Sequence, residues 1–318
     1  DFPYGLRPRS RHVLEHDVFS MFPPGDINPN RSCGITRTCG GGVNTATGNN
    51  TVKNHTVHML LLPYVDQAGL YEQLNMDAAT GKSRHGLNAG ALAGTAAEQA
   101  ANGALIQTVI PGFLCPSDPS GNIPYEQGDN NHYHTNGPAG TTNYLPCGGS
   151  RGWGDSQSYM YGYTATWHHR LPDQRLVLDH GVFGHNGAAK IAQVTDGTSN
   201  TAAFGEARQD RSSADSRPGI EGSHRAAWGA YTWVSNFIVV HPNGNVNHIN
   251  NHRYHLNQGR DKSPLRLRHH GGTASSAHEG GAHFLMADGG VKFLSETLDH
   301  NLYCLINYSR DNEQLGDF

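Results

Sequence analysis

The order of apolar and polar residues divides the chain into a helical front and a β-rich back. In the front, apolar residues recur at helical spacing across residues 57–74, which predicts a helix that lays one face on a sheet. These residues are Val57, Leu61, Tyr64, Ala68, Tyr71 and Leu74. Residues 89–109 are rich in Ala and Gln and predict a second helical segment despite Gly94 and Gly103.

After Pro111 the apolar residues fall in short runs separated by Gly, Asn, Pro and Asp, a pattern typical of antiparallel strands. Strands are expected around residues 143–145, 182–183, 202–205, 227–240 and 282–294. Two long insertions are expected at about 121–180 and 208–270. Because they exceed the ~12–15 residues usual for an unstructured connection, we expect functional or self-packed loops. The sequence therefore predicts an α+β fold dominated by an antiparallel sheet.

The strongest local pattern is a hairpin near the C-terminus. Apolar residues alternate on both sides of Asp288-Gly289, a pair that tolerates the positive φ of a tight turn. We expect strands at about 283–287 and 291–294. Because side chains alternate along a strand, Phe284 and Met286 should lie on one face and the intervening residues on the other. The intervening residues are His283, Leu285 and Ala287.

His278 and Asp288 frame this hairpin, with nine residues between them. One imidazole and one turn carboxylate make an incomplete catalyst, because no nucleophile or oxyanion donor accompanies them in the sequence. We therefore expect His278, Asp288 and Gly289 to form a structural motif, with the His278–Asp288 pair as a hydrogen-bonded brace.

Composition argues against a nucleic-acid-binding protein. Charged residues make up 16% of the chain, and the formal net charge is −4. That balance provides no basic field for nucleic acid, and Lys and Arg form no cluster suited to a membrane surface. Glycine, at 40 residues, indicates a loop-rich protein.

Five cysteines indicate an oxidising compartment. Cys33 and Cys39 flank a short Gly-rich loop, and Cys115, in a Cys-Pro-Ser-Asp turn, is placed to reach Cys147. We expect these two disulfides. Cys304, on an apolar C-terminal segment, is expected to be a buried free thiol rather than a nucleophile.

The segment from Asp196 to Glu206 has two interpretations. Asp and Asn beside Gly favour a tight turn whose side chains bond local amides. The same oxygens of Asp196 and Asn200, together with Glu206, are also suited to a hard cation such as calcium. Both interpretations stay open, and calcium is the cofactor we expect if one is bound.

Two motifs mimic enzyme signatures. Residues 148–152 fit G-x-S-x-G, but residues 153–156 begin no helix of the kind that a nucleophile elbow requires. His278 and His283 in His-Glu-Gly-Gly-Ala-His are five residues apart rather than four, and two glycines interrupt a zincin-type helix. Clustered histidines elsewhere are zinc or copper candidates only if loops converge, and solvated loops are the favoured interpretation. These lie at 132–134, 168–169, 252–255 and 269–270.

Several motifs, in the same order along the chain, resemble a planctomycete-type family of prepilin-like secreted proteins. The family has an H-x9-D-G element near its C-terminus, is catalogued as a domain of unknown function and is also labelled a putative solute-binding family. The matching segments here are 16–25, 61–71, 113–119, 142–144, 181–183, 195–206 and 278–289.

The resemblance implies a pilin-like fold, with an N-terminal helix packed on a sheet-based head. Residues 1–30 contain no apolar run approaching the ~20 residues that a membrane span needs. We therefore expect residues 1–30 to be a remnant of that helix and its exit, from a truncated chain or a variant without its anchor. Residues 31–318 are expected to form the head. Pseudopilins commonly bind calcium, so the resemblance is compatible with that ion without assigning its ligands.

The expected function is a structural subunit of an extracellular or cell-surface pilus-like or pseudopilus-like filament, without catalysis. Self-association would be its main interaction, with secretion-system components as further partners. The alternative is a module that binds an extracellular solute or glycan, with Trp153, Trp167, Trp228 and Trp233 as stacking platforms. A histidine-metal-dependent hydrolase is the third interpretation.

Overall fold

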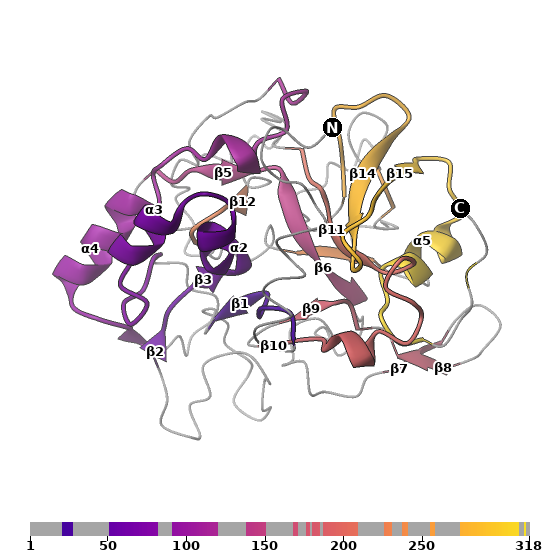
Figure 1. Ribbon diagram of the computed structural model, residues 1–318, viewed down its shortest axis with the longest axis horizontal. Helices are drawn as coiled ribbons and strands as arrows, with labels where there is room; N and C mark the ends of the chain where they lie inside the picture. The colour runs from indigo at the N-terminus through magenta and orange to yellow at the C-terminus, as the bar shows by residue number, and fades with distance from the viewer. Residues whose placement is uncertain are drawn as a thin grey trace, which may run out of the picture.

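A five-stranded sheet organises the chain (Figure 1). The computed structural model describes residues 21–27, 51–81, 91–119, 138–150, 168–170, 176–178, 180–184, 187–208, 226–230, 237–240, 255–257, 274–311 and 315. The strand order is β13-β6-β11-β14-β15, with β13 parallel to β6 and the other neighbours antiparallel. In chain order the strands are β6 (Tyr144–Ser150), β11 (Ala202–Glu206), β13 (Ile238–Val240), β14 (Gly281–Met286) and β15 (Val291–Ser295).

The C-terminal hairpin forms as its sequence predicts. β14 and β15 pair antiparallel, and Gly289 between them has φ +85°. Phe284 and Met286 lie in one core cluster and Leu285 in another, so the predicted alternation of faces is confirmed. The hairpin thus supplies one edge of the sheet and apolar side chains to both layers.

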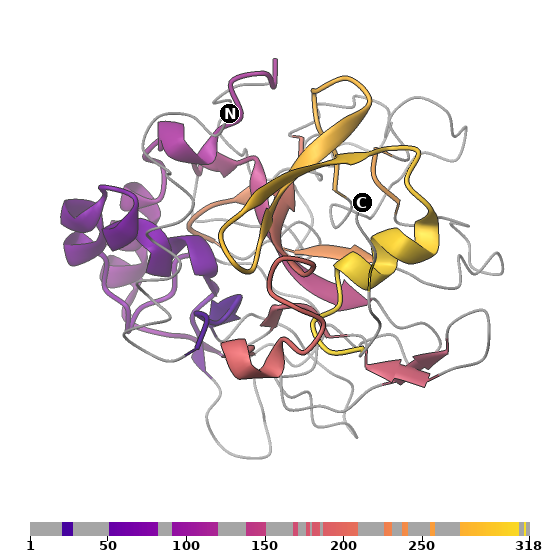
Figure 2. The same cartoon turned by 45° about the vertical axis from the view of Figure 1, so that its right-hand side comes forward.

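One face of the sheet packs on α5 (His300–Ile306), which lies beside the strands in Figures 1 and 2. Asp299 begins this helix, and its carboxylate accepts hydrogen bonds from the backbone N–H groups of Asn301 and Leu302. The ring of Tyr303 meets that of Phe284 edge-on, with centroids 6.1 Å apart. Burial of this apolar stripe against the sheet holds a helix too short to be stable alone.

The opposite face carries a chain of edge-to-face aromatic contacts. Phe183 lies between Phe204 of β11 and Phe22, with ring centroids 5.0 and 5.9 Å apart. The short strands on this side are β1 (Asp26–Ile27), β3 (His55–Thr56), β9 (Phe183–Gly184) and β10 (Gly187–Ala188), with the 3-10 helix η4 (Ile191–Gln193) following. Residues 21–27 are therefore built into the core of the sheet.

A helical layer lies beside the sheet (Figure 1). Its apolar side chains pack around Trp228. The predicted helix over 57–74 is broken into α2 (Val57–Leu61), the 3-10 helix η1 (Leu62–Tyr64) and α3 (Ala68–Gln73). Pro63 lies in η1, and Asp66 adopts a left-handed φ of +61°. Both features interrupt a continuous α-helix between α2 and α3. The predicted segment 89–109 contains β4 (Ala91–Leu92) and α4 (Ala96–Leu105).

Local signals account for the start of α4. Thr95 and Glu98 form a capping box, in which the Thr95 hydroxyl accepts from the Glu98 N–H and the Glu98 carboxylate accepts from the Thr95 N–H.

The remaining elements are β2 (Thr51–Val52), the 3-10 helix η2 (Pro111–Phe113), β5 (Thr141–Thr142), β7 (His168–Arg170), β8 (Leu176–Leu178) and β12 (Ala226–Ala227).

Two buried hydrogen bonds join the helical layer to its neighbours. Nε2 of His58 on α2 lies 2.7 Å from the carbonyl oxygen of Tyr144 on β6. A carbonyl only accepts, so Nε2 carries the proton. The Thr56 hydroxyl donates to the carbonyl of Trp228. The helices are therefore fixed to the sheet by directional contacts as well as by apolar packing.

The observed helices and antiparallel-rich sheet are compatible with the predicted α+β class. Within the described ranges no helix is long and apolar enough to cross a membrane. The proposed N-terminal helix, before residue 21, and most of the insertions at 121–180 and 208–270 lie outside the described residues.

Replacing Gly205 with Ala should destabilise the fold. A Cβ there would lie 2.5 Å from a ring carbon of Phe284 and 2.7 Å from Cδ1 of Ile238. Overpacking of this kind costs about 1–3 kcal/mol of unfolding free energy, measurable by chemical denaturation. Gly69→Ala is the control, since nothing lies within 4 Å and the position is in α3. Equal stability of the two variants would contradict the packing described.

Acid should weaken the joint between α2 and β6. Burial lowers the pKa of His58 to about 4, against a backbone hydrogen bond that raises it. The unfolded chain takes up a proton near pH 6.5, before the folded chain does, so unfolding free energy falls as pH drops through this window. The loss approaches about 3 kcal/mol near pH 4.

The measurement is urea denaturation of wild type and His58→Gln between pH 7 and pH 4. Gln retains a donor for the Tyr144 carbonyl but does not titrate. His55, whose pKa burial also lowers to about 4, stays in both proteins and provides a common background. Identical pH dependence of the two proteins would show that His58 does not titrate as described.

Candidate functional site

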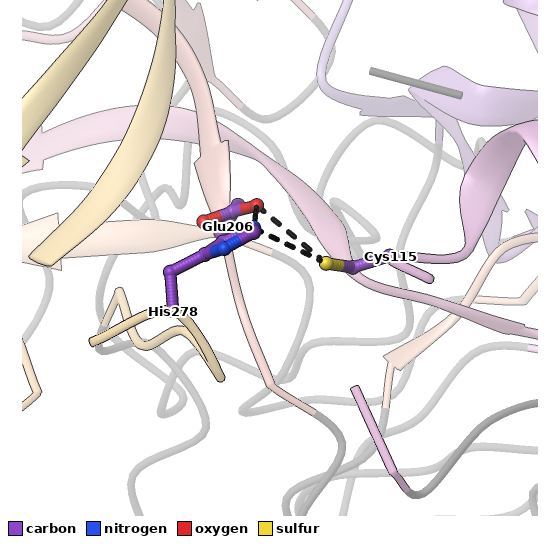
Figure 3. A group of neighbouring side chains, drawn as sticks. All are labelled: Cys115, Glu206 and His278. Carbon is purple, nitrogen blue, oxygen red and sulfur yellow. Dashed lines mark hydrogen bonds and ion pairs between the residues drawn. The ribbon is translucent and has the colours of Figure 1, made fainter. Parts of the chain in front are cut away.

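Three side chains that are distant in sequence meet beside the sheet (Figure 3). Sγ of Cys115 lies 3.7 Å from Oε1 of Glu206 and 3.7 Å from Nε2 of His278. His278 Nε2 lies 3.4 Å from the same Glu206 oxygen. We call these three residues the Cys-Glu-His cluster.

Cys115 is held by a short loop that follows η2. The carbonyl of Cys115 accepts the N–H of Asp118 at 3.0 Å, which closes the Cys-Pro-Ser-Asp turn. The backbone N–H of Cys115 donates to Oδ1 of Asn143 at 2.9 Å. Asn143 in turn donates from Nδ2 to Oδ2 of Asp118 at 2.7 Å. A buried polar network therefore fixes the position from which the thiol projects.

Glu206 ends β11, between β6 and β14. Its side chain is 5% exposed, and Oε2 accepts the backbone N–H of His283 at 2.9 Å. That bond orients the carboxylate, so that Oε1 is the oxygen directed at Cys115 and His278.

A turn at Gly280 and the start of β14 bring the side chains of His278 and His283 together. Gly280 has φ +79°, a conformation that favours glycine, and β14 begins at Gly281. The two imidazole rings meet edge-to-face with centroids 4.8 Å apart. Nδ1 of His283 lies 3.6 Å from Oε2 of Glu206. The prediction that His-Glu-Gly-Gly-Ala-His does not form a zincin helix is confirmed.

The electrostatics of the cluster do not favour a thiolate in the absence of a cation. Burial raises the pKa of the Cys115 thiol, and the Glu206 carboxylate adds to this, against backbone hydrogen bonds that lower it. Burial also lowers the pKa of His283, opposed by Glu206. Cys115 is therefore protonated at neutral pH, unlike an activated nucleophile.

The geometry also differs from a Cys-His-acid relay. In such a relay the acid binds the imidazole nitrogen that does not face the thiol. Here Cys115 and Glu206 both face Nε2 of His278. The arrangement is a convergence of three donor atoms on one point rather than a proton-transfer chain.

Polar side chains surround the buried part of the cluster. They include Asp118, Arg208, Ser275 and Ser276. Arg208 Nε lies 3.9 Å from Oδ1 of Asp118, and its backbone N–H donates to the Ser275 carbonyl at 2.9 Å. The segment before His278 is thus attached to the end of β11.

The proposed calcium ligands do not share one site. Oδ2 of Asp196 accepts the backbone N–H of Asp311 at 2.8 Å, and Asn200 donates from Nδ2 to the Asp196 carbonyl at 3.4 Å. Asp196 and Asn200 precede the first residue of β11, whereas Glu206 is its last. The two ends of this strand lie roughly 13 Å apart. These contacts favour the turn interpretation of Asp196 and Asn200, while Glu206 belongs to the Cys-Glu-His cluster.

The predicted His278–Asp288 brace is wrong in its pairing. The two residues lie beyond opposite ends of β14. Oδ1 of Asp288 accepts the N–H of Gly290 at 2.8 Å within the turn, and the Asp288 N–H donates to the Thr198 carbonyl at 3.1 Å. His278 instead contacts Glu206, because an extended strand separates its ends rather than bringing them together.

The expected Cys115–Cys147 disulfide is not formed, and both thiols are free and buried. Cys147 and Tyr144 lie in different core clusters on β6, and Cys115 lies in the cluster of Tyr144. The alternation of β6 thus directs Cys147 away from Cys115. Cys304 is a buried free thiol, as predicted, whereas Cys33 and Cys39 lie outside the described residues.

Trp228 cannot act as an exposed stacking platform, because it is 0% exposed. Its Nε1 donates to the carbonyl of Thr108 at 2.8 Å, so the ring is a core anchor. Trp153, Trp167 and Trp233 lie outside the described residues.

The sequence singles out each member of the cluster without predicting that they meet. Cys115 is 91 residues from Glu206 and 163 residues from His278. Local spacing holds no information at such separations. The sequence could indicate the members of the cluster only by residue type, because a cysteine, a glutamate and a histidine each lie within a short motif.

Comparison with protein families identifies the chain. A family model described as "Protein of unknown function (DUF1559)", SBP_bac_10, matches residues 16–301. Because the match spans most of the 318 residues, the chain belongs to this family. No curated protein and no solved structure matches it.

Peptide mapping should find Cys115, Cys147 and Cys304 as free thiols. The protein would be denatured in an alkylating reagent without reductant and digested. All three peptides should carry the label, because the thiols lie unpaired in the fold. Cys304, buried on the α5 side, is the internal control. A Cys115–Cys147 linked peptide would contradict the structure.

Proposed function

We propose that this protein is the head of a structural, non-enzymatic subunit of an extracellular or cell-surface filament. The resemblance of its ordered motifs to prepilin-like proteins motivates the proposal. Membership of a family of unknown function is compatible with it and assigns no activity.

The observation that carries the proposal is the anchoring of residues 21–27. Phe22 is 2% exposed, and its backbone N–H donates to the Ala189 carbonyl at 3.0 Å. Gly25 donates to the Gly184 carbonyl at 3.0 Å, and its own carbonyl accepts the Val57 N–H at 2.9 Å. The segment therefore makes regular backbone contacts with two other parts of the head.

Anchoring of this kind suits a subunit that is held through its N-terminal region. Phe22 is joined by an edge-to-face contact to Phe183, which contacts Phe204 on the central strand. A helix preceding Met21 would be coupled to the sheet by a packed segment rather than by a flexible linker. In a filament built on such helices, the head would keep a fixed orientation.

The chemistry of the cluster supports a structural role over an enzymatic one. Without a bound cation, the buried, protonated Cys115 is a poor nucleophile, and His278 directs the same nitrogen at Cys115 and Glu206. In this proposal the protein acts outside the cell and self-associates, with secretion-system components as further partners.

Electron microscopy of cell-surface material from the producing organism tests the proposal. Filaments that bind an antibody raised against the head are expected. A short Gly-Ser linker inserted between Ser20 and Met21 should leave the head folded while uncoupling it, because such linkers are flexible. Filaments of this variant should be fewer or lose their regular outline.

Phe293→Ala is the matched control, since Phe293 is 48% exposed and lies away from the 21–27 segment. Antibody-labelled protein found only as monomers would refute the filament. Regular filaments from the linker variant would remove the role assigned to residues 21–27.

A further inference from the structure

The separations within the Cys-Glu-His cluster match those of ligands around one metal ion. Donor atoms ~2.0–2.3 Å from a tetrahedral ion lie about 3.3–3.7 Å from one another. The observed separations are 3.7 Å for each sulfur contact and 3.4 Å between His278 Nε2 and Glu206 Oε1. All three edges of a tetrahedral face are therefore in place.

Without a cation, contacts of 3.4 to 3.7 Å between the three donor atoms hold the cluster together. The Cys115 thiol has one proton, and it faces both an oxygen of Glu206 and a nitrogen of His278 at 3.7 Å. Nε2 of His278 can donate once or accept once, yet it faces two groups. A single cation at the common point would contact all three donor atoms.

The surroundings orient each ligand. The second oxygen of Glu206 accepts the His283 N–H, and the Cys115 N–H donates to Asn143. The backbone N–H of His278 donates to Oγ of Ser276 at 3.1 Å. Contacts of this kind, made by atoms that do not face the ion, are what orients the ligands of protein metal sites.

We propose that Cys115, Glu206 and His278 bind one zinc-type divalent transition-metal ion. Thiolate and imidazole ligands favour such an ion over calcium, which prefers six to eight oxygen ligands. On binding, the Cys115 S–H bond breaks, its proton passes to solvent and a sulfur–metal bond forms. The thiolate and the carboxylate together balance the two positive charges of the ion.

Two histidines form the partly exposed side of the cluster. The side chains of His278 and His283 are 30% and 25% exposed, whereas Glu206 is buried. A water molecule would complete the coordination of the bound ion, and the His283 backbone N–H would keep Glu206 oriented toward it. Bound in this way, the ion would join the loop after η2, the end of β11 and the loop before β14.

Cobalt and zinc titrations of the chelator-treated chain test this site. We expect one ion per chain by calorimetry and, with Co2+, a sulfur-to-metal charge-transfer band in the near ultraviolet. Cys115→Ser should remove the band, while Cys304→Ser, which alters another buried thiol, should retain it. Removal of a direct ligand should lower Zn2+ affinity by at least about a hundredfold. Removal of a group that only hydrogen-bonds to a ligand already lowers metal affinity by up to about a hundredfold.

Glu206→Gln keeps an acceptor for the His283 N–H and removes the charge, so it should weaken Zn2+ binding in a folded protein. Glu206→Gln also tests the metal site if the Cys115→Ser variant fails to fold. Circular dichroism monitors folding throughout, and Ca2+ should not displace Co2+. A folded wild-type chain that takes up neither ion would overturn the proposal. So would Zn2+ affinity unchanged in Glu206→Gln, or a charge-transfer band that survives in Cys115→Ser.

Discussion

The position of Glu206 depends on the pairing of β11 with strands on both sides. β11 is hydrogen-bonded to β6 and to β14, and its residues are buried along the whole strand. A carboxylate at the end of such a strand has little freedom to move. Its contacts with Cys115, His278 and the His283 N–H hold three separate segments around one buried group.

The same sheet connects the site to the rest of the protein. Asn143, immediately before β6, binds the Cys115 loop, and Tyr144 accepts a hydrogen bond from His58 of the helical layer. Phe204, two residues before Glu206, lies in the aromatic contacts that reach Phe22. The cluster, the helices and the N-terminal anchor therefore share the two central strands.

Local sequence signals predicted the parts of the fold that local interactions determine. The Asp288-Gly289 hairpin and the alternation of Phe284 with Leu285 followed from turn chemistry and strand period. The single helix predicted over 57–74 was wrong, because the helical spacing of apolar residues continues across a break at Pro63 and Asp66. The Cys-Glu-His cluster and the pairing of His278 depend on contacts between distant segments, which one sequence does not specify.

Assembly of the sheet out of sequence order has a consequence for folding kinetics. The strands that flank β11 come from residues 144–150 and 281–286, so its pairing requires the closure of two long stretches of chain. Contacts of such high sequence separation slow folding, because chain entropy is lost before the contacts form. The chain must therefore extend through β14 before Glu206 gains its final neighbours, so the Cys-Glu-His cluster forms late in folding.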